Sequence, residues 1–166
     1  MKNILVIGGG KIGSVVAELL VDTPEAGGYS VTVADHSAAT LARIDADPQR
    51  SPRLTTLLLD VTDPAQLSRA LQGQFAVLSA APYHLTLHVA KAAKAAGVHY
   101  LDLTEDVAST RAIRALAADA TTAFIPQCGL PPVSSRSWPP IWHASSTRST
   151  RCACASARCP PTPATR

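Results

Sequence analysis

The chain has 166 residues, of which 46% are hydrophobic and 16% charged, and this is enough for one domain with a buried core. Its net charge of +3 arises from five arginines that follow the last acidic residue, Asp119; without them, 10 basic and 12 acidic residues leave −2. We therefore expect no nucleic-acid partner, and we expect no membrane span because no apolar run reaches about 18 residues. The N-terminal apolar stretch is too short for an export signal, which predicts a cytoplasmic protein.

Strand and helix patterns alternate along the first 130 residues. Short β-rich or apolar runs predict six strands, at Asn3–Gly8, Tyr29–Ala34, Leu54–Leu59, Phe75–Ala80, Val98–Leu103 and Ala123–Pro126. Helical spacing and capping signals predict five helices between them, at Ile12–Val21, Ser37–Ala46, Asp63–Gly73, His84–Ala96 and Val107–Ala118. Alternating strands and helices indicate βαβ units with right-handed crossovers. The sequence thus predicts an α/β fold, a doubly wound parallel sheet of about six strands of the Rossmann type.

Two local patterns refine these elements. Leu54–Leu59 is apolar enough for a parallel strand that is buried on both faces. The helix after it has an N-cap candidate in Asp63, with Pro64 at its first position and Gln66 placed to complete a capping box. Gly73 is expected to end that helix.

The sequence Gly8-Gly9-Gly10-Lys11-Ile12-Gly13, between the first strand and the first helix, fits the pattern G-x-G-x-x-G. Gly8 allows a tight turn, Gly10 lets the backbone approach a pyrophosphate, and Gly13 lets the helix pack close to the strand. The free N–H groups and the positive end of the helix dipole then face the phosphates. In this strand–loop–helix setting the loop predicts a dinucleotide site, and a purely structural turn is the alternative.

Acidic residues at the ends of the second and third predicted strands complete this site. Asp35, 22 residues after the last glycine of the loop, can accept hydrogen bonds from the adenosine ribose. With His36 beside it and no Lys or Arg at positions 36 and 37, the pattern favours NAD. Arg43 on the next helix remains a candidate for a 2′-phosphate, so NADP stays open. Asp60 and Val61 either flank the adenine or form the turn that leads into the next helix.

Small residues follow the fourth predicted strand, in the run Ser79-Ala80-Ala81-Pro82-Tyr83, and permit close approach of a nicotinamide. The segments VIGGGKIGS, VLSAAPYH and AAGVHYLDLTED resemble the saccharopine dehydrogenase-like family, which includes saccharopine reductases and lysine dehydrogenases, over about Met1–Leu130. The resemblance implies cofactor contacts from Gly8, Gly10, Lys11, Ile12, Asp35, Asp60, Val61, Ala80, Ala81, Pro82 and Tyr83. It also implies that Asp102, Thr104 and Glu105 lie on the cofactor or substrate side.

The resemblance further implies an oxidoreductase that uses NAD, or NADP, at the C–N bond of an amino-acid substrate. Members of the family continue into a substrate and dimerisation domain, and the similarity here stops near Leu130. We therefore expect residues 1–130 to be a dinucleotide-binding domain with little or no turnover alone, and a homodimer only where the missing domain is present. A nucleotide-sensing module without catalysis and a poorly folding fragment are the alternatives.

Residues 131–166 show no helical or strand period and contain no Lys, Asp or Glu. Their Ser, Thr, Pro, Arg and Cys content fits GC-rich DNA read in a shifted frame, and we expect an irregular, disordered tail in place of the substrate domain. An arginine-rich binding arm is the alternative. Cys152, Cys154 and Cys159 lack the paired spacing of a zinc site, so we expect no metal there.

Other polar residues have both a functional and a structural interpretation. The acidic residues within 102–106 offer either a general base or a helix cap. His84 and His88 are four residues apart on a predicted helix, but without a Glu between them we expect surface histidines rather than metal ligands. Cys128 is expected to be a buried structural thiol.

Overall fold

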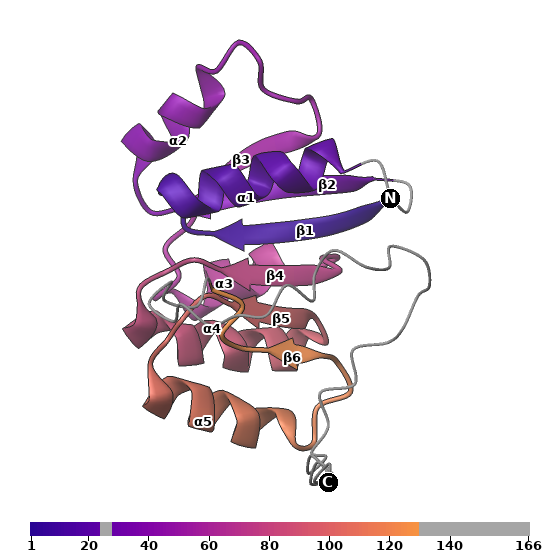
Figure 1. Cartoon of the computed structure of the whole chain (residues 1–166), viewed down its shortest axis with the longest axis vertical. Coiled ribbons are helices and arrows are strands. Elements are labelled where there is room, and N and C mark those ends of the chain that lie inside the picture. Colours follow the sequence, from indigo (N-terminus) through magenta and orange to yellow (C-terminus); the bar gives the residue numbers. More distant parts are fainter. Residues whose placement is uncertain (24–27, 130–166) are drawn as a thin grey trace, which may run out of the picture. The chain divides into compact units, whose positions relative to one another are not determined.

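The computed structural model describes residues 1–23 and 28–129, and the predictions made for residues 131–166 lie outside this part (Figure 1). Its strands are β1 (Lys2–Ile7), β2 (Tyr29–Asp35), β3 (Leu54–Leu58), β4 (Ala76–Ser79), β5 (His99–Asp102) and β6 (Phe124–Ile125). Its helices are α1 (Lys11–Asp22), α2 (Ala38–Asp45), α3 (Pro64–Leu71), α4 (Tyr83–Ala96) and α5 (Val107–Ala117). None of these helices is long and apolar enough to cross a membrane.

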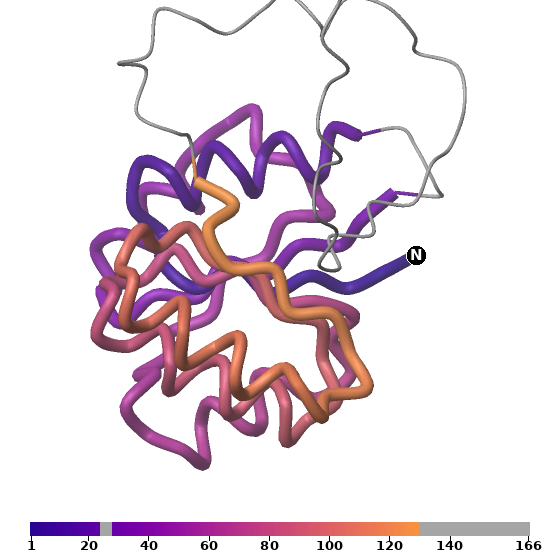
Figure 2. The backbone as a smooth tube through the Cα atoms, turned by 60° about the horizontal axis from the view of Figure 1, so that its bottom comes forward, coloured from indigo at the N-terminus to yellow at the C-terminus, as the bar shows by residue number. Residues whose placement is uncertain are grey.

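The strands form one parallel sheet in the order β3-β2-β1-β4-β5-β6. The chain moves from β1 outward to β3, returns through α3 to the other side of β1, and moves outward again to β6. Because the crossovers of parallel strands are right-handed, α1 and α2 lie on one face and α3, α4 and α5 on the other. Figure 2 shows this as indigo α1 on one side and the pink and orange helices opposite. This is the predicted doubly wound α/β fold.

Each face of the sheet has its own hydrophobic cluster. Helix α1 buries Ala17 and Val21 against Val6, Val31 and Val33 of the central strands. On the other face, α3, α4 and α5 cover a larger cluster that includes Leu5, Leu67, Val77, Val89, Tyr100 and Ile113. Burial on both faces fixes the strand register, and it therefore fixes the strand ends that carry the polar residues.

Strand β3 differs from the expectation drawn from its sequence. It lies at the edge of the sheet, where Leu54 is buried but Leu58 is 59% exposed. The prediction of a strand buried on both faces is wrong, because the helices that cover the central strands do not cover the full length of this edge strand. Its apolar sequence does not reveal this position, which depends on where the other strands pair.

Capping confirms most of the predicted helix ends and corrects one detail. Asp63 Oδ1 accepts N–H groups of the first turn, so Asp63 is the N-cap of α3 and Pro64 its first residue. Gln66 does not complete a capping box: its Nε2 donates to Asp63 Oδ2 at 2.8 Å, because the Asp63 N–H already donates to Asp60 O at 3.2 Å. Helix α4 ends at Gly97, which has a φ of 66° in the left-handed region.

Candidate functional site

The loop of residues 8–13 joins β1 to α1 in a conformation that its glycines permit. Gly8 has a φ of +103°, and its N–H donates to Ala34 O at 2.8 Å, which anchors the loop on β2. A Cβ atom at Gly13 would lie 1.8 Å from Gly8 O, so any side chain there collides with the loop backbone. A Cβ atom at Gly10 would meet no atom within 4 Å, and the backbone of Gly10 is therefore open to a ligand.

The N-terminus of α1 leaves its first N–H groups without a helical acceptor. Its N-cap is Gly10, which makes no side-chain capping hydrogen bond, and its first turn contains no acidic residue. The N–H groups of Lys11, Ile12 and Gly13 precede the first helical hydrogen bond, which Ser14 N donates to Gly10 O at 3.0 Å. Unsatisfied N–H groups at the positive end of a helix suit a phosphate, so the loop fits the pyrophosphate of a dinucleotide.

Asp35, at the end of β2, ties the glycine loop to the start of α2. Its Oδ2 accepts the Gly9 N–H at 2.7 Å, and its Oδ1 accepts the Ser37 N–H at 2.8 Å. His36 Nδ1 lies 3.2 Å from Asp35 Oδ1, and the His36 side chain is 86% exposed whereas that of Asp35 is 11% exposed. Each carboxylate oxygen has a second lone pair, so Asp35 can still accept a ribose hydroxyl while it holds the loop.

A crevice of 580 Å³ opens beside the glycine loop, at the carboxyl edge of the sheet where the strand order reverses. Residues at the ends of β1, β2, β3 and β4 and in the first turn of α4 line it. At the β3 end, Asp60 Oδ1 accepts the Thr62 N–H at 2.8 Å and the Thr62 hydroxyl at 2.7 Å. These bonds hold the pKa of Asp60 below its usual value, so it is a carboxylate at neutral pH.

Most of the predicted cofactor residues meet in this crevice. Those that line it are Gly8, Gly10, Asp35, His36, Asp60, Val61, Ala80, Ala81 and Pro82. Gly9 and Lys11 line a neighbouring groove instead, and Gly13 is buried beneath the loop. Ile12 and Tyr83 line neither cavity, and their side chains are 64% and 63% exposed.

Sequence reasoning missed six residues that line the crevice. They are Ile7, Ala34, Leu59, Thr62, His84 and Leu85. For His84 the signal was incomplete: the sequence places the start of α4 at the carboxyl edge, but not which residue of its first turn faces the crevice. The apolar residues carried no such signal, since strand ends of this kind are buried in the core as often as they line a cavity.

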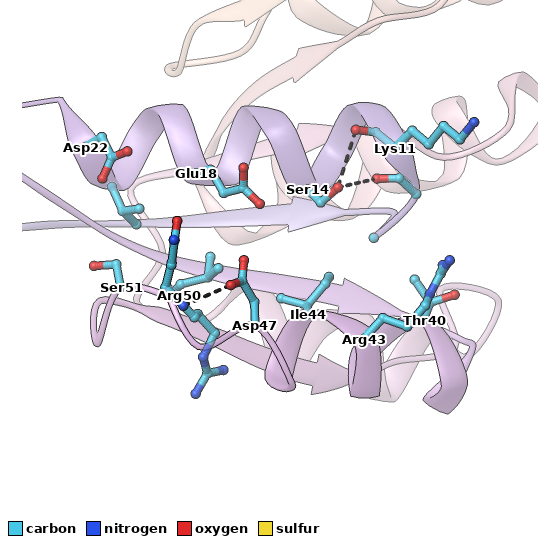
Figure 3. Close-up of a pocket in the computed structure, with 15 residues that line it drawn as sticks. Lys11, Ser14, Glu18, Asp22, Thr40, Arg43, Ile44, Asp47, Arg50 and Ser51 are labelled. Carbon is cyan, nitrogen blue, oxygen red and sulfur yellow. Dashed lines mark hydrogen bonds between the residues drawn. The ribbon is translucent and has the colours of Figure 1, made fainter.

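A second groove, of 370 Å³, separates α1 from α2 (Figure 3). Lys11, Ser14 and Glu18 form one wall, and Thr40 and Arg43 belong to the other. Arg43 is exposed and forms no salt bridge with another described residue. The groove and the crevice share Gly10, so the two cavities meet at the glycine loop.

Residues 4–125 match the protein family described as "Saccharopine dehydrogenase NADP binding domain". The chain belongs to this family. The match spans the sheet from β1 to β6, so the described part of the chain is an NAD(P)-binding domain of this family. The resemblance predicted from VIGGGKIGS and VLSAAPYH is confirmed.

Solved structures are also similar to this chain. Apo saccharopine dehydrogenase (L-Glu forming) from Saccharomyces cerevisiae is 26% identical, with a TM-score of 0.66, and the alignment covers 78% of this chain. It covers only 28% of the yeast chain, so this protein spans little more than a quarter of that enzyme. A Rossmann-fold NAD(P)-binding family protein from Shigella flexneri is 25% identical, with a TM-score of 0.53, over 70% of this chain and 60% of that one.

Two acidic residues at and after the end of β5, Asp102 and Asp106, make structural hydrogen bonds. Asp106 is the N-cap of α5, and its Oδ2 accepts the Ser109 N–H at 2.7 Å, which holds the pKa of Asp106 below its usual value. Asp102 is fully buried, and its Oδ1 accepts N–H groups from Thr104 at 3.0 Å and Gln127 at 3.2 Å. Asp102 thus fixes the loop after β5 and the segment after β6 to each other.

Tyr100 of β5 and Cys128 after β6 differ in burial. Burial and the nearby Asp102 carboxylate raise the pKa of Tyr100, whose hydroxyl donates to Thr86 O of α4 at 3.2 Å. Cys128 is exposed, with its Sγ 3.2 Å from Ile125 O. The prediction of a buried thiol at Cys128 is wrong, because the chain passes from β6, an edge strand, to the surface at this point.

Proposed function

We propose that the loop of residues 8–13 and the adjoining crevice bind one NAD(P) molecule. The observation that carries this proposal is the open backbone of Gly10 beside uncapped N–H groups of α1, at the mouth of a 580 Å³ crevice. In this proposal the N–H groups of residues 10–13 bind the pyrophosphate. A crevice with apolar walls and a few polar groups is what a nucleoside requires.

The two ends of the crevice would hold the two nucleosides. Asp35 and His36 would contact the adenosine ribose, and Asp60 and Val61 the adenine, because these residues end β2 and β3 on one side of the loop. The small residues of the run 80–83 would let the nicotinamide half approach β4 closely. A bound nicotinamide supplies hydride transfer, and the chain's own residues bind it and orient it.

We further propose that the domain serves an oxidoreductase acting on the C–N bond of an amino-acid substrate, and that this chain alone binds cofactor with little or no turnover. The support is the family match, together with the 28% of the yeast enzyme that the alignment covers. The unusual composition of residues 131–166 supports a shifted reading frame after codon 130. The nucleotide sequence downstream of that codon tests this, and a gene without a family-like continuation in another frame contradicts it.

Cofactor binding is tested by calorimetric titration of the chain with NADPH and NADH, and by thermal melts with each. Ligand at about 100 times Kd stabilises a folded protein by about 2.7 kcal/mol, so we expect a clear rise in Tm. Unchanged melts and no binding heat at millimolar dinucleotide contradict the proposal. Strong amino-acid-dependent reduction of NADP⁺ by this chain contradicts only the claim of little turnover.

The sequence favours NAD, and we propose that Arg43 lets the same site accept NADP as well. Arg43 has no salt-bridge partner among the described residues and lines the groove that meets the crevice at Gly10, where a 2′-phosphate would project beyond Asp35. Arg43→Ala is then expected to weaken NADPH about tenfold and leave NADH unchanged, since a charge-assisted contact to phosphate is lost. Arg50→Ala, at the same groove, is the matched control, and equal losses for both dinucleotides contradict the assignment.

A further inference from the structure

A stripe of exposed apolar side chains runs along the outer face of α1. Ile12, Val15 and Leu19 are 64%, 52% and 64% exposed, whereas Ala17 and Val21 on the inner face are buried against the sheet. Side chains three and four residues apart lie on one face of an α-helix, so these three form a continuous surface. An exposed apolar patch with a charged border marks an interaction site.

Charged side chains border this stripe in a fixed order. Lys11, Glu18 and Asp22 follow one edge of α1 from its N-terminus to its C-terminus (Figure 3). All three are exposed, and none forms a salt bridge with another described residue. The border is therefore positive at one end of the helix and negative at the other.

The charges on two copies of α1 complement each other when the two helices pack antiparallel. A second α1 that packs antiparallel brings Lys11 of each copy beside Glu18 and Asp22 of the other, whereas parallel packing brings like charges together. The two helix dipoles also attract each other when antiparallel. The surface thus fits a second copy of this chain related by a two-fold axis. With this symmetry the same patch forms both sides of the interface.

In contrast to the expectation that a homodimer requires a further domain, we propose that the outer face of α1 is itself a homodimer interface, with its two-fold axis beside Val15. Ile12 of each copy packs against Leu19 of the other, since these residues are two helical turns, about 10.5 Å, apart on either side of the axis. Val15 and Leu19 line neither cavity, so the interface leaves the crevice open. One 12-residue helix covers far less than the roughly 800 Å² per partner of a standard interface, and the dimer is weak and concentration-dependent.

Sedimentation equilibrium of the full chain over a wide range of concentrations tests this interface. We expect a reversible monomer–dimer equilibrium that Val15→Asp shifts to monomer, because two carboxylates then meet at the axis. Val107→Asp is the matched control: Val107 is 58% exposed on α5, so the same change there leaves the dimer intact. Thermal melts establish that both variants are folded.

Charge exchange tests the orientation independently of the apolar contact. Glu18→Lys is expected to weaken the dimer about tenfold, and the triple variant Lys11→Glu/Glu18→Lys/Asp22→Lys to restore it, because each pair of residues across the axis then carries opposite charges again. A chain that is monomeric at every concentration overturns the proposal and leaves the stripe to a different protein. A dimer that responds equally to Val15→Asp and Val107→Asp, or that the triple variant fails to restore, also overturns it.

Discussion

Gly10 and Gly13 of the loop of residues 8–13 differ in why a side chain would be unfavourable there. Gly13 is needed by the fold itself, because a Cβ atom there would lie 1.8 Å from Gly8 O. Gly10 has open space where its Cβ would be, so the protein without ligand has no steric need for glycine at this position. A ligand that approaches the backbone, as proposed for the pyrophosphate, would give Gly10 a reason to lack a side chain.

Substituting each glycine by alanine separates these two reasons. Gly10→Ala is expected to leave Tm nearly unchanged but to weaken dinucleotide binding by about tenfold, or about 1.4 kcal/mol, because the methyl group occupies the approach to the pyrophosphate. Gly13→Ala is expected to lower both Tm and affinity, since the loop must move away from α1. Thermal melts and calorimetric titration measure the two effects. Full affinity in Gly10→Ala contradicts the pyrophosphate site.

At the scale of elements, helix caps connect sequence to structure most directly. Asp63 and Asp106 each precede a helix and accept N–H groups of its first turn. Hydrogen bonds from Gln66 and Ala65 hold the pKa of Asp63 below its usual value. A carboxyl group whose pKa is lower in the folded state stabilises the fold above its unfolded pKa, and this contribution is lost as the pH falls through the folded value.

Asp63→Ala tests this linkage. At pH 7 we expect the variant to melt a few degrees below the parent chain, because α3 loses its N-cap. The difference should shrink as the pH falls below about 4, where the Asp63 carboxyl of the parent is progressively protonated. Glu105→Ala, an exposed acidic residue that caps no helix, serves as the control. A difference in Tm that is the same at pH 7 and at pH 2 is incompatible with this account.

Elements differ in how much of their environment the sequence reveals. The ends of α3 and α4 follow from Asp63, Pro64 and Gly97, because capping depends on residues within one turn. The exposure of Leu58 and Cys128 cannot be inferred from nearby residues, because it depends on β3 and β6 being the edges of the sheet. Pairing order is set by contacts between distant segments, which no local pattern records.

At the scale of the whole domain, the reversal of strand order assembles the site. The first half of the chain supplies the glycine loop and Asp35, and the second half supplies Ala80 and His84, across the boundary between β1 and β4. The carboxyl edge as the location of the site is predictable from the βαβ pattern. That His84 rather than Tyr83 lines the crevice is not predictable from the sequence, because it depends on how α4 is rotated about its axis.

We expect this domain to fold and bind without residues 132–166. The sheet, both hydrophobic clusters and the crevice are built from residues within 1–129. A chain shortened after residue 131 should therefore melt cooperatively, with a Tm within a few degrees of the full chain, and should bind dinucleotide with a Kd within about twofold. Melts with and without NADPH measure both. Loss of the cooperative transition on shortening would show that residues 132–166 contribute to the stability of the sheet, and the division of the chain near residue 130 would then be wrong.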